Sequence, residues 1–314
     1  MLKAILNRLL TVVPSAIIGA MLIFGVVHLT PGGPAAAMLG PDASAEVMER
    51  LTRELGLDAP VHVQFGRWVA GIFQGDLGRS LLSKEPVINL IFDRLPYTTT
   101  LALEALVLAL LIGVPLGVWA GIRRGTPLDT SIRTVSGLAF AFPEFWVGML
   151  AMGVFALQLY WFPATGFVLP NQGIAAHLNS AVLPVCTLAI GPIAIFTRFT
   201  RSAMVEALSG HYVRTARSLG LSPFQINWRF ALKNALIPIV TVIGLVASGL
   251  IGGAVLVERV FAIPGLGDLL AEAVLQKDFP VVQGTTAFLM IVVIVINLLV
   301  DIAVAALDPR TRIA

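Results

Sequence analysis

The chain has 314 residues, of which 57% are hydrophobic and only 12% are charged, and its mean hydropathy is +0.89. Soluble domains carry about 25% charged residues, so this composition excludes a soluble enzyme and indicates an integral membrane protein. The single cysteine, Cys186, excludes an intramolecular disulfide, and the spacing of the histidines is not that of metal ligands. The net charge of +3 is better explained by membrane orientation than by nucleic-acid binding, so we expect no nucleic-acid partner.

Apolar stretches of about 20 residues, the length needed to cross a bilayer, occur at six places. The predicted spans are 9–29, 98–121, 134–158, 181–203, 236–257 and 281–306, and prolines at 143, 184 and 192 interrupt the third and fourth. The first span exceeds the core of a secretory signal and lacks an A-x-A-like cleavage site, so we expect it to be retained. The sequence therefore predicts an all-α integral membrane protein with six transmembrane helices.

Lys and Arg gather in alternate connections: before the first span, after the second, after the fourth and after the sixth. By the positive-inside rule, both termini and these connections are predicted to be cytoplasmic. Segment 30–97 is then extracytoplasmic, either a small cap or a solvated spacer. We therefore expect four parts in chain order: the N-terminus and first helix (1–29), the extracytoplasmic segment (30–97), the transmembrane core (98–306) and a cytoplasmic tail (307–314). Within the core, we expect a cytoplasmic loop at 206–233 and an external loop at 258–280.

The cytoplasmic loop 206–233 carries four Lys and Arg residues, Arg214, Arg217, Arg229 and Lys233, and one acidic residue, Glu206, together with several aromatic residues. Gly220 is placed to end a first short helix, and Ser222 followed by Pro223 is typical of the N-cap and first position of a second. Aromatic anchors with a basic rim suit docking onto a cytoplasmic protein. The alternative is a helix pair lying on anionic lipid headgroups.

Other polar and small residues mark the external loop and the spans. Pro264 and Gly265 predict a turn among apolar residues, which either folds back into the protein or meets an external partner. Glu144, directly after Pro143, is the best candidate for a cavity-facing acid within a span, whereas Asp301 is expected to pair near the membrane surface. Small residues four positions apart predict close helix packing, at Gly113, Gly117 and Gly121 in one span and at Gly244, Ser248 and Gly252 in another.

The sequence lacks a nucleotide-binding P-loop, a dinucleotide fingerprint, a zinc-protease motif and a nucleophile elbow. We therefore expect no catalytic residue, no metal and no cofactor in this chain. An autonomous channel or an ion-coupled secondary carrier, with Glu144 and Asp301 as its polar path, is the alternative to a transport subunit that needs partners.

Motifs along most of the chain resemble one family. Residues 212–224 read Tyr-Val-Arg-Thr-Ala-Arg-Ser-Leu-Gly-Leu-Ser-Pro-Phe, and further motifs are Gly75-Asp76-Leu77-Gly78-Arg79-Ser80, Arg94-Leu95-Pro96, Phe261-Ala262-Ile263-Pro264-Gly265-Leu266-Gly267 and Leu307-Asp308-Pro309-Arg310. Together they resemble the permease subunits of bacterial ABC importers, in the dipeptide, oligopeptide and nickel group. Of the general E-A-A, G and I-x-L-P pattern of importers, only Ala216, Gly220 and Leu232 fit literally, and the departures look like those of the peptide group.

The resemblance implies the fold of a type I importer permease in the bacterial inner membrane. It also implies the partners: a second homologous permease subunit, two cytoplasmic ATPase subunits that bind ATP and Mg, and an extracytoplasmic solute-binding protein. The solute would be a dipeptide, an oligopeptide or a similar compound. An ATPase would contact the coupling loop at Tyr212, Val213, Arg214, Thr215, Ala216, Arg217 and Gly220. The binding protein or the solute would meet the external loop at Glu258, Phe261, Pro264 and Gly265.

Overall fold

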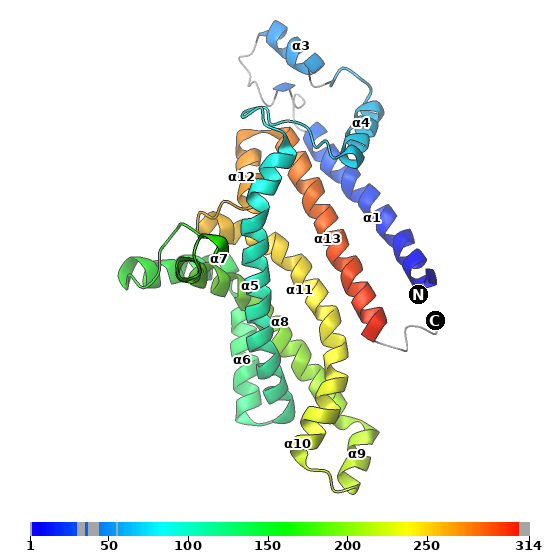
Figure 1. The fold of residues 1–314 in the computed structure, drawn as a ribbon, viewed down its shortest axis with the longest axis vertical. Helices are drawn as coiled ribbons and strands as arrows, with labels where there is room; N and C mark the ends of the chain where they lie inside the picture. The colour runs from blue at the N-terminus through cyan, green and yellow to red at the C-terminus, as the bar shows by residue number, and fades with distance from the viewer. Residues whose placement is uncertain (1, 30–34, 37–43, 55, 308–314) are drawn as a thin grey trace. The chain divides into compact units, whose positions relative to one another are not determined.

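A computed structural model describes residues 2–29, 35–36, 44–54 and 56–307. Its described residues are almost entirely helical (Figure 1). They form two compact units, one of residues 1–96 and 264–294 and one of residues 97–263 and 295–314. The helices α5 (Val87–Ile122) and α13 (Phe279–Leu307) each contribute to both units.

The smaller unit is built around two apolar clusters. Buried Leu77, Val87 and Ile91 pack with Leu266 and Leu269 in one cluster. The other is aromatic and joins two helices of the unit. The helices of this unit, besides parts of α5 and α13, are α1 (Leu2–His28), α3 (Ala45–Glu54), α4 (Val61–Gln74) and α12 (Leu266–Gln276).

That aromatic cluster involves α1 and α4. Phe24 stacks on His28 with ring centroids 4.0 Å apart, and the ring of Phe65 meets Phe24 edge-on at 5.4 Å. Such pairs are favourable beyond their buried area. Within segment 30–97, the described residues form two helices, α3 and α4. The end of segment 30–97 already belongs to the next helix. Helix α5 begins at Val87, eleven residues before the predicted start of the second span at 98.

The larger unit is centred on α8 (Ile174–Ser209), which packs against α5, α6 (Pro127–Ala141), α7 (Glu144–Ala151) and α11 (Leu232–Val260). Pro184 and Pro192 do not end α8, which stays helical through both. The interior of this unit is the largest apolar cluster, with Leu101, Leu188 and Phe196 fully buried.

The predicted packing face of α5 is confirmed. A Cβ atom added at Gly113 would lie 2.8 Å from Ile193 O, and one at Gly117 would lie 2.5 Å from Thr200 Cβ, so the two backbones approach as closely as glycine permits. The second stripe is confirmed in part. Gly244 lies against Val300, while nothing lies within 4 Å of a Cβ at Gly252.

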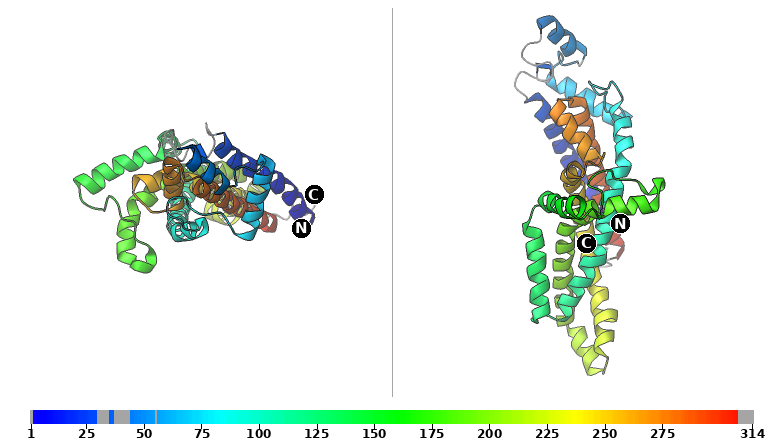
Figure 2. Two further views of the ribbon diagram at one scale, coloured as in Figure 1. Left: turned by 90° about the horizontal axis from the view of Figure 1, so that it is seen from above. Right: turned by 90° about the vertical axis from the view of Figure 1, so that its left-hand side faces the viewer.

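The third predicted span, 134–158, is not one straight helix. It is divided into α6, α7 and a π-helical segment, Met152–Gln158, and the two halves are bent by 94°. The bend falls at Phe142, which is extended at φ −92° and ψ 136° because the following Pro143 disfavours the α-region. Figure 2 shows α7 and the segment after it running across the direction of α6.

Among the described residues, four helices are long and apolar enough to cross a membrane, or five if the bent pair counts as one span, whereas the sequence predicted six. The four are Val87–Ile122, Ile174–Ser209, Pro238–Val260 and Phe279–Val304. The predicted span 9–29 lies within α1, whose apolar part Val13–His28 is shorter than the four spanning helices. The protein is therefore an all-helical membrane protein with four to five candidate spans among its described residues.

Candidate functional site

The predicted coupling loop forms a short helix mounted on the end of α8. Helix α9 (His211–Ser218) turns two side chains inward, Val213 and Ala216, which are 1% and 5% exposed. They pack with buried Ile226 and with Leu208 and Leu221. Positions three apart share one face of a helix, so this small apolar cluster fixes α9 to the rest of the larger unit. In Figure 1, α9 and α10 lie together at the lower ends of α8 and α11.

The opposite face of α9 is exposed and basic. Tyr212, Arg214, Thr215 and Arg217 all lie on the surface, as does Gly220 just beyond the helix. The structure thus divides the predicted contact residues into two kinds. Val213 and Ala216 hold the helix in place, and the other five are accessible to another molecule.

Both helix boundaries in this loop are as predicted. Gly220 has φ +76°, the left-handed conformation that glycine adopts most readily, and its N–H donates to the carbonyl of Arg217 at 3.0 Å. Ser222 accepts from the backbone N–H of Gln225 at 3.3 Å in a capping box, and Pro223 follows as the first helical residue. The second helix is longer than expected. Helix α10 (Pro223–Gln225) continues through a π-helical segment, Ile226–Ala231, directly into α11.

The external loop 258–280 presents few of its predicted contact residues. Glu258 is fully buried, and Thr98 Oγ1 donates to its Oε1 at 2.6 Å. Phe261 is 2% exposed and belongs to the main apolar cluster, Gly265 is buried and Pro264 is half-buried. Part of the expected loop is helical, as α12. The sequence showed an acid next to a turn, but it could not show that the acid points inward to a threonine 160 positions earlier.

Glu144 is the first residue of α7, directly after the bend, and it is half-buried. A Cβ atom at Gly191 of α8 would collide with its Oε1, and one at Gly253 of α11 would lie 3.2 Å from its Oε2. The carboxylate therefore rests against two glycines on two different helices. Within the described part of the chain, no hydrogen bond or ion pair reaches it.

Two polar pairs within the larger unit were not foreseen. Arg201 of α8 binds Asp129 of α6 through two hydrogen bonds, Nε to Oδ1 at 2.5 Å and an Nη to Oδ2 at 2.8 Å. The Gly125 N–H donates to the same carboxylate at 2.9 Å, and Asp129 is only 2% exposed. This bidentate pair fixes α6 to α8. Its only signal in the sequence was one acid just after a basic turn.

The second pair joins His177 of α8 to Glu104 of α5, with Nε2 and Oε1 2.6 Å apart. His177 Nδ1 lies 2.7 Å from the carbonyl oxygen of Val168, so both ring nitrogens have partners. Glu104 is the only charged residue in the long apolar stretch 96–121. It is partnered inside the protein, as an acid in an apolar helix generally is. No cluster of three or more metal-binding side chains occurs among the residues whose placement is described.

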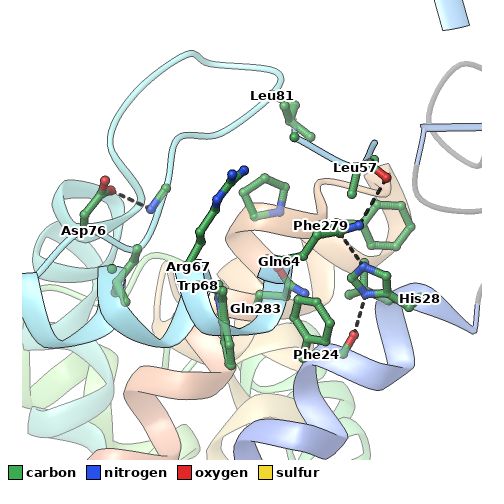
Figure 3. Close-up of a pocket in the computed structure, with 16 residues that line it drawn as sticks. Phe24, His28, Leu57, Gln64, Arg67, Trp68, Asp76, Leu81, Phe279 and Gln283 are labelled. Atoms are coloured by element: carbon green, nitrogen blue, oxygen red, sulfur yellow. Dashed lines mark hydrogen bonds between the residues drawn. The ribbon is translucent and has the colours of Figure 1, made fainter. Parts of the chain in front are cut away.

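In the smaller unit, a cavity of about 400 Å³ lies beside α1 and α4 (Figure 3). His28 and Gln64 meet across it, with Nε2 and Oε1 2.9 Å apart, and Gln64 donates in turn to the carbonyl of Leu57 at 3.1 Å. Asp76 Oδ1 accepts from the Gly78 N–H at 2.9 Å. These polar groups are occupied in holding turns of the segment, including the Gly75–Ser80 motif, and Arg67 is the charged side chain that extends freely in Figure 3.

The chain matches two family descriptions that together cover nearly its whole length. Residues 113–313 match the "Binding-protein-dependent transport system inner membrane component", and residues 1–102 match the N-terminal part of the same kind of membrane component. It is 42% identical over 312 residues to a Brucella abortus protein named "Putative peptide transport system permease protein", with 99% of each chain covered. It is 39% identical over 312 residues to the glutathione transport system permease protein GsiC of Salmonella paratyphi A, again with 99% of each covered.

Among solved structures, a chain of the MetNI methionine ABC transporter in an inward-facing conformation has the same fold. The TM-score is 0.56 at 18% sequence identity, and the match covers 70% of this chain and 96% of that one. The likeness supports the arrangement of the helices only. From the sequence matches, this chain belongs to the binding-protein-dependent transport system inner membrane components, and it is a non-catalytic, multi-pass permease subunit of an ABC importer.

Proposed function

We propose that this chain and a second, homologous permease subunit form the translocation path for a dipeptide, an oligopeptide or a peptide-like solute. Two cytoplasmic ATPase subunits, which bind ATP and Mg, drive transport, and an extracytoplasmic solute-binding protein delivers the solute. The names of the Brucella and Salmonella relatives support a peptide or glutathione as solute. Both termini lie in the cytoplasm, as the distribution of basic residues predicts.

The observation that carries this proposal is the two-sided character of α9. Val213 and Ala216 anchor the helix, while Arg214 and Arg217 lie exposed beside Tyr212. A helix that served only to connect two spans would not need a buried anchor and a separate basic aromatic face. Such a face can dock in a groove of an ATPase, and the anchor transmits the motion of that subunit to α8 and α11.

Charge reversal on the exposed face tests the docking role without disturbing the anchor. We expect Arg214→Glu with Arg217→Glu to abolish co-purification of the ATPase subunits and solute-stimulated ATP hydrolysis, because interface charges control association. Arg124→Glu is the matched control, because it reverses an exposed arginine in the turn between α5 and α6. Co-purification of the ATPases with the double variant at the level of the control would refute the docking role of α9. A chain that is isolated alone and conducts in liposomes would instead establish the autonomous channel or carrier.

Glu144 is a residue of the translocation path in this proposal. Its carboxylate has no partner within the described chain, and the two glycines beside it leave room that any larger residue would fill. A positively charged group of the solute, such as a peptide α-ammonium, is a suitable passing partner. We expect Glu144→Gln to lower the uptake of a cationic peptide more than that of an acidic one, at equal protein level. Equal uptake of both by the variant and the wild type would remove Glu144 from the path.

Fewer residues of the external loop are accessible to the binding protein than the sequence suggested. Because Glu258, Phe261 and Gly265 are buried, we propose that only the exposed rim of this turn, Ala262 with half-buried Pro264, meets the binding protein. Single-cysteine crosslinking in a Cys186→Ser background can test it. Crosslinks to the binding protein from position 262 are expected, and their absence would exclude this turn from the contact.

A further inference from the structure

A second cavity, of about 710 Å³, lies within the larger unit between α6 and α8 and extends to Leu245 of α11. Three arginines line it, Arg133 from α6 and Arg198 and Arg201 from α8, and its lining contains no acidic residue. Neither the proposed docking face of α9 nor Glu144 is part of this cavity. The proposed roles of α9 and Glu144 therefore do not explain why three positive charges gather in this cavity between apolar helices.

The charges of the three arginines are compensated unequally. Arg201 is bound to Asp129 through two hydrogen bonds. Arg133 and Arg198 are exposed, and in the described part of the chain neither makes an ion pair or a hydrogen bond. Arginines on membrane helices normally pair with an anion or reach water. Asp129 also attracts Arg133 electrostatically, but its carboxylate is already bound to Arg201. The cavity thus offers two guanidinium groups that no carboxylate of the described chain binds directly.

The remaining wall is apolar and open. Phe140, Phe199 and Leu245 line the cavity and are 65%, 47% and 64% exposed. A small water-soluble anion would use the arginines but leave this apolar wall uncovered. A ligand with an anionic group and a hydrocarbon chain would cover both kinds of surface, and the cavity lies in the size range of ligand sites.

The position of the cavity arginines relative to the membrane surface also suits a lipid headgroup. Asp129, the third residue of α6, is bound to Arg201, so the start of α6 lies level with that part of α8. Arg133 is four residues further along α6, or about 6 Å at 1.5 Å per residue. The turn just before α6 carries the exposed Arg123 and Arg124, which places this level near one surface of the membrane.

We propose that this cavity is a binding site for an anionic phospholipid. Arg133 and Arg198 bind the phosphate group, and an acyl chain lies along Phe140, Phe199 and Leu245. The three arginines share one nearby carboxylate, that of Asp129, and the lipid supplies the further negative charge. Basic pockets between transmembrane helices recognise anionic headgroups by this combination of charge and apolar surface.

The test uses the complete transporter, purified in mild detergent, stripped of lipid and titrated with phosphatidylglycerol or phosphatidylcholine of identical acyl chains, with bound lipid counted by native mass spectrometry. We expect tighter binding of phosphatidylglycerol to the wild type. We expect about fivefold weaker binding for Arg133→Gln or Arg198→Gln and about 25-fold weaker binding for both, the usual contribution of a basic residue near an anionic lipid.

Two further variants make the result specific. Arg124→Gln removes an exposed arginine outside the cavity and is expected to bind phosphatidylglycerol as the wild type does. Arg133→Lys with Arg198→Lys keeps both charges, is expected to retain most of the binding, and remains informative if the glutamine pair fails to fold. Unchanged phosphatidylglycerol binding by the glutamine pair, or equal binding of the two lipids by the wild type, would overturn the proposal. So would equally strong binding of glycerol phosphate or an acidic dipeptide, because either would show that the acyl chain is not recognised.

Discussion

Replacing Gly117 by alanine is the sharpest test of how α5 and α8 are held together. The added Cβ would lie 2.5 Å from Thr200 Cβ, 2.7 Å from Thr197 O and 3.0 Å from Arg201 N. Two of these atoms are backbone and the third is fixed to it, so no side-chain rotation relieves the clash. Overpacking of this kind costs about 1–3 kcal/mol, and the higher helix propensity of alanine returns at most about 1 kcal/mol.

The matched control is Gly249→Ala in α11. Both glycines are inside long apolar helices, but nothing lies within 4 Å of a Cβ at position 249. The control substitution should therefore be neutral or stabilising by up to about 1 kcal/mol. The two variants should differ by about 1–3 kcal/mol in the free energy of unfolding, although the chemical change is the same.

The assay is unfolding of the purified chain in mixed micelles, followed by helix content as the fraction of denaturing detergent rises. The expected difference corresponds to roughly a fivefold to 150-fold change in the unfolding equilibrium. Equal unfolding curves for Gly117→Ala and Gly249→Ala would refute the close approach of α5 to α8. A loss for both variants would show that glycine flexibility, and not packing, is what matters.

Three further predictions concern the same unit. Arg201→Met should destabilise the protein by about 3 kcal/mol because it leaves Asp129 buried without its partner, and Asp129→Asn combined with it should recover part of that loss in the same unfolding assay. Ser222→Ala should remove a helix cap worth about 1 kcal/mol, seen as faster proteolysis of the coupling loop. Val213→Ala should expose the same loop to protease by opening its anchor, whereas Thr215→Ala, on the exposed face, should not.

The helix boundaries in loop 206–233 were predictable because they depend on neighbouring residues. The left-handed Gly220 and the cap at Ser222 are encoded within a few positions of the chain. The glycine stripe of α5 was equally readable, since residues four apart share one helix face. By contrast, the inward orientation of Glu258 depends on its hydrogen bond with Thr98, and the packing of α6 on α8 depends on the bond between Asp129 and Arg201. In each pair the two residues lie far apart in the sequence, so local rules could not predict them.

The bend in the third predicted span shows the limit of a length criterion. Apolar residues from 134 to 158 are numerous enough for a straight crossing, and hydropathy alone gives no reason to divide them. The residue before a proline, however, is restricted to extended backbone, and Phe142 obeys that restriction. Backbone sterics therefore decide the shape here, and the bend places Glu144 at the start of α7 beside Gly191 and Gly253.

If α9 is the docking site proposed above, the same local contacts determine how its motion is transmitted to the membrane helices. Helix α8 is continuous from Ile174 to Ser209, and its end is joined to α9 through Gly210 and the anchor around Val213. Glycine contacts with α5 and the Asp129–Arg201 pair with α6 lie along the same helix. Close-packed contacts transmit displacement because they cannot be compressed. A movement imposed on α9 by an ATPase would therefore carry α5, α6 and α8 together, and the hinge is expected where backbone continuity is broken, at Phe142 and Pro143.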